Sequence, residues 1–310
     1  MKYSACFDIG GTYIKFGVIS SSGGIFTTGK VATPKENAAI QIPEIIAHQV
    51  ALMSQKYEIQ NIGISACGLI DHERGEVLFS ANIKDYSGLQ LARIVKEKTN
   101  LHVSVENDVR CACLGEVWLG AAQGKQDVVL LTLGTGIGGA VVINGRLMRG
   151  AGYLAGELGH MSIVHDGESC PCGFKGCLER YASTGALVRH YTRISGNDSA
   201  NGNDSANGKE IMDLVKKQDP HARAAYDNFL DYLSTGLVNI THLYNPEVII
   251  IGGGITAQGK SLLEDIQEKY QHKVMDVYKV STEITLARLR NHAALYGAYT
   301  VVNQVEEMVR

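Results

Sequence analysis

The stretch "FDIGGTYIK", residues 7–15, decides the fold of this sequence. Two apolar runs flank a Gly-Gly-Thr turn, a pattern that predicts the two strands of a β-hairpin. Asp8 places a carboxylate next to the turn and Thr12 adds a hydroxyl, while the two glycines leave backbone N–H groups accessible. A magnesium-bound phosphate needs these three kinds of group. The alternative interpretation is an ordinary hairpin in which Asp8 serves as a capping residue.

A second glycine-rich turn, "GTGIGG", occupies residues 134–139 and satisfies the dinucleotide-binding pattern G-x-G-x-x-G. A dinucleotide-binding fold requires a helix directly after the turn. The residues that follow, "AVVINGRLM", instead alternate like a strand and contain a hairpin turn at Asn144 and Gly145. We therefore predict a β-hairpin whose tight turn presents backbone N–H groups and Thr135 to an anion.

The order of the expected elements repeats along the chain. A strand, a turn and a strand, followed by mixed strands and helices, begin at residue 3 and again at residue 128. Two similar α/β halves of this kind would place a ligand between them. Strands are expected over residues 3–9, 13–20 and 127–133, and helices over residues 36–57, 183–193 and 221–244.

A third glycine motif, "GITAQGKS" at residues 254–261, matches the P-loop pattern G-x4-G-K-[ST] after an apolar run. A P-loop domain also needs a later strand that ends in Asp to hold magnesium. The sequence after Ser261 is too short for that domain and has no such strand. The motif is therefore interpreted as a chance match, with Lys260 at the start of a surface helix.

Three cysteines in eight residues indicate a metal site. Cys170, Cys172 and Cys177, in C-x-C-x4-C spacing with nearby glycines, follow a histidine at position 160. Three thiolates and one imidazole form a closed, structural zinc site. His165 is a rival for the fourth ligand, and three chance thiols in a loop are the plainer alternative.

Polar residues near this cluster and at the end of a strand suit a polyhydroxylated ligand. Glu157 and Glu179 flank the cysteine cluster, and carboxylates accept hydrogen bonds from sugar hydroxyls. In "VEND", residues 105–108, Asn107 could bridge two hydroxyls and Asp108 could take a proton from one of them. The alternative role for Asp108 is the N-cap of the following helix.

Composition excludes several classes of function. The formal net charge is −3 and no long basic run occurs, so a nucleic-acid partner is not expected. No apolar run approaches the 18 residues of a membrane span, and the first residues lack the apolar stretch of a signal peptide, so a cytoplasmic location is expected. The tandem repeat at residues 196–208, "GNDSANGNDSANG", predicts a mobile polar surface loop with no chemistry of its own.

Taken together, these motifs resemble the ROK family of sugar kinases (repressor, open reading frame, kinase), which has the actin-like ATPase fold. The resemblance runs from Asp8 to about Gly254, and "GTGIGGAVVINGRLMRGAGYLAGELGH" followed by "CPCGFKGCLE" is its most specific part. It implies two RNase H-like α/β domains with a cleft between them. The chain departs from the family at Cys67–Gly68, where Pro-Gly is usual.

The resemblance also assigns roles to residues. It implies Asp108 as the catalytic base and His160, Cys170, Cys172 and Cys177 as zinc ligands. The sugar contacts that it implies are Gly68, Asn82, Asn107, Asp108, Glu157, His160 and Glu179. The residues that would bind ATP and Mg2+ are Asp8, Gly10, Gly11, Thr12, Lys15, Gly134, Thr135, Gly136, Gly252, Gly253 and Gly254.

The sequence therefore predicts an ATP- and Mg2+-dependent kinase that phosphorylates the 6-hydroxyl of a hexose or N-acetylhexosamine. A P-loop NTPase and a non-catalytic sugar sensor remain alternatives. The resemblance implies a homodimer. Family repressors carry a helix-turn-helix ahead of the first phosphate motif, and the residues before Asp8 leave no room for one. The expected domains are residues 1–117, with a helix at about 293–310 packed back on them, and residues 118–292 with the zinc site.

Overall fold

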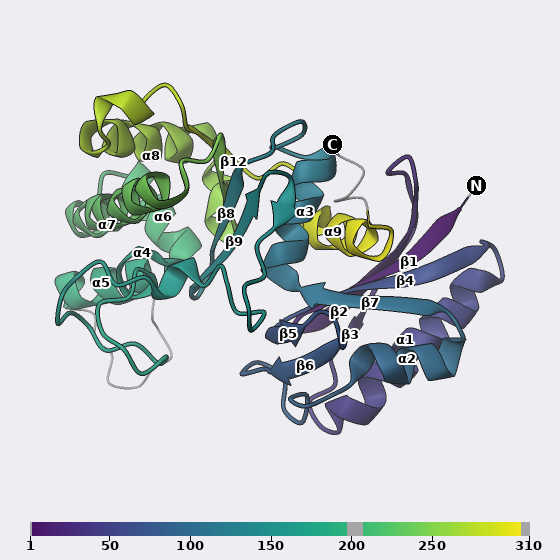
Figure 1. Ribbon diagram of the computed structural model, residues 1–310. Helices are drawn as coiled ribbons and strands as arrows, with labels where there is room; N and C mark the ends of the chain where they lie inside the picture. Colours follow the sequence, from purple (N-terminus) through teal and green to yellow (C-terminus); the bar gives the residue numbers. More distant parts are fainter. Residues whose placement is uncertain (1, 197–206, 305–310) are drawn as a thin grey trace. The chain divides into compact units, whose positions relative to one another are not determined.

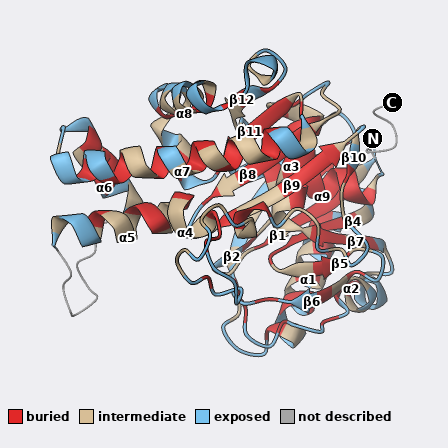
Figure 2. Cartoon of the chain, turned by 60° about the vertical axis from the view of Figure 1, so that its left-hand side comes forward, coloured by how far each residue is buried: buried red, intermediate tan, exposed pale blue. Residues whose placement is uncertain are grey.

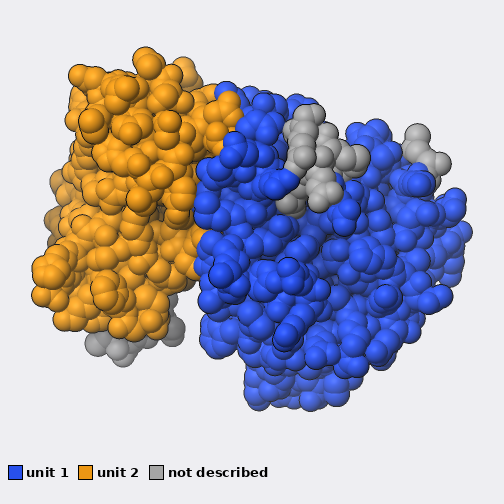
Figure 3. Space-filling view, in the orientation of Figure 1, with its two compact units in different colours: residues 1–126, 141–155, 288–310 blue, residues 127–140, 156–287 orange. Residues whose placement is uncertain are grey.

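The computed structural model describes residues 2–196 and 207–304 of the chain (Figure 1). These residues form two compact units, coloured separately in Figure 3. Unit 1 comprises residues 1–126, 141–155 and 288–310, and unit 2 comprises residues 127–140 and 156–287. The domain boundaries expected at residues 117 and 292 stay a prediction.

Unit 1 is built on a five-stranded mixed sheet with the order β3-β2-β1-β4-β7. Its first three strands are antiparallel neighbours, whereas β4 lies parallel to β1 and β7 lies parallel to β4. The strands are β1 (Tyr3–Ile9), β2 (Tyr13–Ser20), β3 (Ile25–Ala32), β4 (Ile59–Ala66) and β7 (His102–Asn107), and a small hairpin comprises β5 (Leu69–Asp71) and β6 (Glu76–Phe79).

Helices cover both faces of this sheet (Figure 1). On one face lie α1 (Ala38–Ser54) and α2 (Leu91–Thr99), and on the other lies α9 (Ala293–Val302), with α3 (Asp108–Leu119) packed along it. Alternate residues of β1 are sorted accordingly, because successive side chains of a strand point to opposite faces. Ala5, Phe7 and Ile9 join the buried cluster with α1 and α2, shown red in Figure 2. Asp8 therefore points to the face on which α9 lies.

Glycines allow α3 and α9 to approach closely. A Cβ atom on Gly297 would lie 1.7 Å from the carbonyl oxygen of Cys111, and one on Gly115 would lie 2.2 Å from the carbonyl oxygen of Ala293. Backbone atoms occupy these positions, so a side chain could enter only if the two helices moved apart. Trp118 of α3 stacks on Tyr299 of α9, with ring centroids 4.7 Å apart.

The second five-stranded sheet has the order β10-β9-β8-β11-β12. Parallel pairing joins β8 to β11 and β11 to β12. Its strands are β8 (Val128–Leu133), β9 (Ile137–Ile143), β10 (Arg146–Leu147), β11 (Val248–Gly252) and β12 (Glu283–Leu286). The α-helices of unit 2 are α4 (Glu179–Ala182), α5 (Thr184–Ser195), α6 (Gly208–Lys216), α7 (Pro220–Tyr244) and α8 (Lys260–Lys273). Short 3-10 helices occur in unit 2 at η1 (Leu158–His160), η2 (Gly254–Gln258) and η3 (Asp276–Tyr278), and in unit 1 at η4 (Arg290–His292).

Most expected elements are confirmed. Strands β1, β2 and β8 and helices α1, α5 and α7 lie where the patterns predict them, and α8 begins at Lys260 as expected. Lys260 is 87% exposed and pairs with Glu264 of its own helix at 3.2 Å, as a surface residue does. No helix in the described part of the chain has both the length and the apolar character needed to cross a membrane.

The expected loop at residues 196–208 is partly wrong. Residues 197–206 lie outside the described ranges, but Asn207 and Gly208 belong to the start of α6. The Asn207 side chain accepts hydrogen bonds from the N–H groups of Lys209 and Glu210, and the Glu210 carboxylate accepts one from the N–H of Asn207. This capping box fixes the helix start, and an Asn followed three residues later by Glu was its signal in the sequence.

Candidate active site and metal centre

Asp108 is the first residue of α3, directly after β7. Asn107 is the N-cap of this helix, because its Oδ1 accepts hydrogen bonds from the N–H groups of Val109 at 3.0 Å and Arg110 at 3.1 Å. The alternative that Asp108 caps the helix is therefore wrong. The Asn107 amide nitrogen donates to the carbonyl oxygen of Gly68 and to Oδ1 of Asp108, both at 3.0 Å. The oxygen and the nitrogen of the Asn107 amide therefore both bond to groups of the protein, and the bond from its nitrogen orients the Asp108 carboxylate.

Burial, and after it the nearby charge of Asp8, raises the pKa of the Asp108 carboxyl to about 6. The N–H of Val109 and the amide of Asn107 act in the opposite direction by bonding to the carboxylate. A base with a pKa close to neutral is ionised at neutral pH and still able to accept a proton in a reaction. Asp108 thus has the chemistry of a general base.

Asp8 lies on the central strand of the unit 1 sheet, between two polar neighbours. The pairing register places it opposite Lys15 of β2 and Ser65 of β4. Its Oδ1 accepts a hydrogen bond from the Ser65 hydroxyl at 3.0 Å, and its Oδ2 lies 3.3 Å from the Lys15 ammonium. No local pattern predicts Ser65 here, because the register of parallel strands joins residues that are distant along the chain.

The Gly-Gly-Thr turn after β1 is held at its base. The N–H of Gly10 donates to the carbonyl oxygen of Tyr13, and the Gly10 carbonyl accepts from the Thr33 hydroxyl at 2.6 Å. Asn82 lies beside the turn, since a Cβ atom on Gly11 would be 3.5 Å from the Asn82 Cβ. Thr12 is exposed at the tip.

Gly68 occupies a position that only glycine fits. Its φ is 114°, and a Cβ atom there would lie 2.3 Å from the carbonyl oxygen of Phe79. The preceding Cys67, at the position where the family usually has proline, donates its N–H to the carbonyl oxygen of Ile9 at 3.1 Å. A proline could not make this bond. Cys67 in place of the family's proline therefore gives up the rigidity of the proline ring and gains a hydrogen bond to β1, the strand that carries Asp8.

A buried ionic network behind Asp108 has no counterpart in the predictions. Glu106 is fully buried and accepts hydrogen bonds from Arg149 at 2.7 Å and from Arg110 at 3.4 Å. Arg110 also donates to the carbonyl oxygens of Tyr153 and Ala155, both at 2.8 Å. This network ties the start of α3 to the segment around residues 149–155, within unit 1. The Glu at the end of an apolar strand was its only signal in the sequence.

Unit 2 contains a cavity of about 520 Å³. Small-molecule sites usually have volumes of about 300–1,000 Å³. Four segments that are far apart in the sequence line it: the second glycine turn, the start of α5, the start of α6, and η2. The lining residues are Leu133, Gly134, Thr135, Thr184, Gly185, Val188, Asn207, Gly208, Lys209, Met212, Gly254, Ile255, Ala257 and Gln258.

Some of the predicted nucleotide-binding residues meet at this cavity. Gly134, Thr135 and Gly254 line it, whereas Gly136, Gly252 and Gly253 do not. Gly253 has φ 94°, and a Cβ atom there would lie 2.2 Å from the carbonyl oxygen of Leu133. Its role in this structure is therefore to let η2 pass close to β8.

Two polar lining residues, Gln258 and Lys209, were missed by sequence reasoning. The Oε1 atom of Gln258 is buried without a hydrogen-bond partner among the described residues. An unpaired buried acceptor is costly, and a donor on a bound molecule would satisfy it. Lys209 adds a positive charge to a cavity that already contains the glycine turn. The donor and acceptor set therefore fits a nucleotide.

Glu179 connects the second glycine turn with the cysteine cluster. Its Oε2 accepts a hydrogen bond from the N–H of Ile137 at 3.2 Å, and its Oε1 lies 3.5 Å from the Cys170 sulfur. A Cβ atom on Gly136 would lie 2.3 Å from Oε2 of Glu179, so the glycine leaves room for the carboxylate. Glu157, by contrast, is exposed and precedes η1 without capping it through its side chain.

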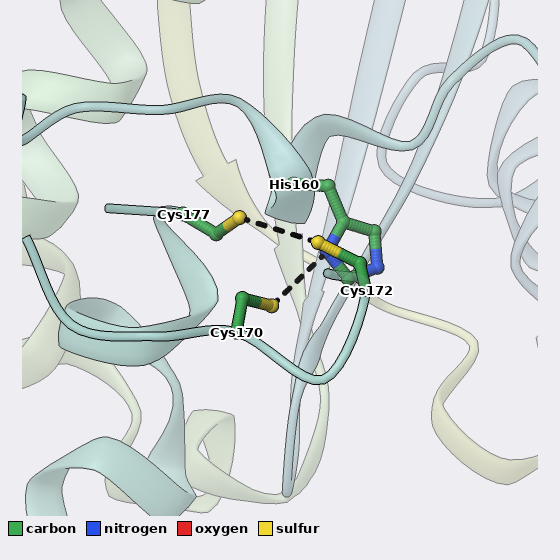
Figure 4. A group of neighbouring side chains, drawn as sticks. All are labelled: His160, Cys170, Cys172 and Cys177. Carbon is green, nitrogen blue, oxygen red and sulfur yellow. Dashed lines mark hydrogen bonds between the residues drawn. The ribbon is translucent and has the colours of Figure 1, made fainter. Parts of the chain in front are cut away.

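The four expected metal ligands converge in unit 2 (Figure 4). The ligand atoms of His160, Cys170, Cys172 and Cys177 all lie within 4.8 Å of one another. Cys172 and Cys177 have their sulfurs 3.6 Å apart, and the Cys170 sulfur lies 3.6 Å from Nδ1 of His160. A tetrahedral site with metal–ligand bonds of about 2.0–2.3 Å has ligand–ligand distances of about 3.5–3.8 Å. The donor set and spacing therefore fit zinc.

His165, the rival ligand, is 99% exposed and lies 3.6 Å from Asp166. It is not a member of the cluster. Because Nδ1 of His160 faces the sulfurs, its Nε2 is left without a protein partner among the described residues. The ring can thus serve the cluster with one nitrogen and a second ligand with the other.

The predicted residues are divided between the two units. Asp8, Gly68, Asn82, Asn107 and Asp108 belong to unit 1. The residues from Gly134 to Gly136, Glu157, His160 and Glu179 belong to unit 2, together with the cysteine cluster.

The ROK family model matches residues 4–305, which is nearly the whole chain. The chain belongs to the ROK family. The ROK protein is 33% identical to the glucokinase of Thermotoga maritima, over 96% of each chain. It is 32% identical to the β-glucoside kinase of Listeria innocua, over 95% of each chain.

A solved structure is similar over the same length. The ROK family glucokinase from Streptomyces griseus, crystallised with glucose and AMPPNP, has a TM-score of 0.82 and 34% identity, covering 97% of this chain and 99% of that one. This match confirms the expected α/β fold of the actin-like ATPase type. Membership of the family and the full-length matches to kinases support a carbohydrate kinase.

Proposed function

We propose that the ROK protein is an ATP- and Mg2+-dependent kinase that transfers the γ-phosphate of ATP to the 6-hydroxyl of a hexose or N-acetylhexosamine. Relatives of both kinds, a glucokinase and a β-glucoside kinase, support phosphorylation of a sugar without deciding which sugar. Glucose, N-acetylmannosamine and β-glucosides are the candidate substrates. The sugar contacts expected at Gly68, Asn82, Asn107, Glu157, His160 and Glu179 stay individual predictions.

The observation that carries this proposal is the state of Asp108. Its carboxyl group has a pKa of about 6, and Asn107 and the N–H of Val109 fix its orientation. In the proposed reaction Asp108 accepts the proton of the sugar hydroxyl while that oxygen attacks the γ-phosphate. Phosphoryl transfer needs positioning and charge stabilisation more than covalent chemistry from the protein.

The nucleotide is assigned to the cavity in unit 2, where Gly134, Thr135 and Gly254 meet. Lys209 lies where it can neutralise negative charge, and the unpaired Gln258 oxygen can accept a hydrogen bond from the base or ribose. Asp8, with Lys15 and Ser65 around its carboxylate, is the proposed holder of Mg2+, which would neutralise phosphate charge when bound.

Zinc is proposed as a structural ion at His160, Cys170, Cys172 and Cys177. A closed set of four protein ligands leaves no position for a metal-bound water, so its contribution is rigidity. Glu179 follows the ligand Cys177 by two residues, so that rigidity reaches the second glycine turn, where the N–H of Ile137 donates to the Glu179 carboxylate.

The decisive test is a coupled assay of ADP release with a panel of glucose, N-acetylmannosamine, N-acetylglucosamine and a β-glucoside. At least one sugar should be phosphorylated, and its 6-deoxy analogue should not. The Asp108→Asn variant should lose roughly 10²–10⁴-fold in turnover while it keeps sugar affinity, because general-base catalysis contributes that much. Near-normal turnover of this variant would remove Asp108 from its role.

The two alternatives give different results in the same experiments. A P-loop NTPase would lose nearly all ATP use in the Lys260→Ala variant, whereas the proposed kinase should lose little because Lys260 lies exposed on α8. A non-catalytic sensor would bind a sugar from the panel and release no ADP with any of them. The homodimer and the cytoplasmic location stay predictions.

A further inference from the structure

A second cavity in unit 2 contains none of the residues assigned to sugar, nucleotide or metal. It has a volume of about 80 Å³ and lies between α4, α5 and α7, which are neighbours in Figure 1. A cavity needs about 10–15 Å³ measured in this way to hold one water molecule. The space therefore accommodates several waters or one small ion. Its charged and polar lining includes Glu168, Arg180, Arg189, His190, Arg193 and Asn228, besides the two tyrosines Tyr181 and Tyr232.

The lining carries more positive than negative charge. Glu168 faces two of the three guanidinium groups, at 3.6 Å from Arg180 and 3.1 Å from Arg193. Arg189 has no ion pair among the described residues and donates only to the carbonyl oxygen of Arg180, at 3.1 Å. Burial and the charge of Arg180 lower the pKa of Arg189, against the weaker opposing effect of Glu168 and Glu179. Its charge is therefore incompletely compensated by the protein.

Arg180 adds an unused donor to the same space. Its Nε atom is buried and has no hydrogen-bond partner among the described residues. A buried donor without an acceptor costs free energy, so such atoms often mark the place of a missing water, ion or ligand. His190 completes the wall, and its Nε2 lies 2.9 Å from the amide nitrogen of Asn228. Burial and the charge of Arg193 lower the pKa of His190, which leaves this ring neutral at neutral pH.

We propose that this cavity binds a phosphate-type oxyanion, either free phosphate or the phosphate group of a small ester. Guanidinium groups bind phosphate through paired N–H donors, and three of them at one small space supply both the charge and the number of donors that a tetrahedral dianion requires. Arg193 is 64% exposed, so the cavity has a rim that reaches solvent. An ester can therefore place its phosphate inside and its organic part at the rim.

This site is separate from the nucleotide cavity but shares a helix with it. Thr184, Gly185 and Val188 of α5 line the nucleotide cavity, and Arg189 and Arg193 of the same helix line the smaller one. The anion site therefore stands whether or not the proposed function is correct, because it depends only on the arginine cluster.

The test is isothermal titration of the full-length, metal-loaded protein with inorganic phosphate and, separately, with glycerol 3-phosphate at constant ionic strength. A saturating non-hydrolysable ATP analogue is present so that the nucleotide cavity is occupied. One or both probes should bind saturably, and the stronger of the two identifies free phosphate or an ester as the source. Arg189→Gln should weaken binding by about tenfold or more, since a hydrogen bond to a charged group contributes that much.

A matched control and a second variant keep the result clear. Arg223→Gln removes the same charge from α7, where Arg223 is exposed and pairs with Asp227 at 3.3 Å, and should leave affinity unchanged. Arg193→Gln should weaken binding like Arg189→Gln, and it decides the matter if Arg189→Gln fails to fold by circular dichroism. The proposal is overturned if neither probe binds saturably, or if binding survives the folded cavity variants at full strength.

Discussion

Replacing Asp108 with asparagine should make the protein more stable at neutral pH while it abolishes most activity. The pKa of the Asp108 carboxyl is raised from 3.8 to about 6 in the folded protein, mainly by burial. A raised pKa of this size corresponds to about 3 kcal/mol of unfavourable free energy once the group is ionised. Asparagine has nearly the same shape and cannot ionise, so the variant escapes this cost.

The direction of the pH dependence follows from the two pKa values. Below about pH 4 the carboxyl is protonated in the folded and the unfolded protein, so native protein and variant should have similar stability. Between about pH 4 and pH 6 only the unfolded chain ionises freely, and the native protein loses stability relative to the variant. Above pH 6 the variant should exceed the unsubstituted protein in free energy of unfolding by a nearly constant amount of about 3 kcal/mol.

The fluorescence of Trp118 gives a direct measurement. It is the only tryptophan of the chain and stacks on Tyr299 of α9, so it reports on unfolding of unit 1. Urea unfolding of native protein and Asp108→Asn should be compared at several values between pH 4 and pH 8. Asp213→Asn, which removes an exposed carboxylate of α6, is the control and should show no such trend. A variant that is equally stable or less stable than native protein at pH 8 would refute the reasoning.

Three further predictions concern packing, buried charge and metal. Gly297→Ala should destabilise unit 1 by about 3 kcal/mol, because the new methyl group would overlap the carbonyl oxygen of Cys111; unchanged urea unfolding would contradict the close helix contact. Glu116→Gln should lower the free energy of unfolding by about 2–3 kcal/mol in the same assay, since the fully buried carboxylate accepts hydrogen bonds from three backbone N–H groups. An unchanged free energy of unfolding would contradict the contribution of these three bonds. A strong chelator should lower the melting temperature, and Cys170→Ser should abolish zinc retention by atomic absorption while His165→Ala keeps it; an equal effect of both substitutions would contradict the ligand assignment.

Local patterns account for what the sequence predicted well. The two hairpins follow from apolar alternation around glycine turns, and each turn is contained in a few residues. The cysteine cluster was equally accessible, because His160 and Cys177 are close in sequence and their side-chain chemistry is distinctive. These predictions needed no knowledge of how distant segments meet.

Contacts between distant segments could not be predicted in the same way. Gly115 and Gly297 read as ordinary, slightly unfavourable helix residues until α3 and α9 are placed together. Ser65 reaches Asp8 only through the register of two parallel strands, and Glu179 reaches Ile137 across a long stretch of chain. The assignment of Asn107 was limited for a different reason, because an Asn before a helix serves equally as a cap and as a ligand contact.

The packing of α9 in unit 1 has a consequence for synthesis on the ribosome. The strands of the first sheet are made before unit 2, yet α9, which covers one face of that sheet and contacts α3 through Gly297, is made after all of unit 2. Domains generally fold in the order of their synthesis, at about 5–20 residues per second. Here the first sheet cannot complete its packing until α9 has been made, about 10–40 seconds later at those rates. During this time the surface around Gly63 and Gly115, which α9 covers in the finished structure, stays uncovered. Unit 2 can complete its fold first, and the nascent chain presents an unfinished N-terminal sheet to chaperones until residues 293–302 emerge.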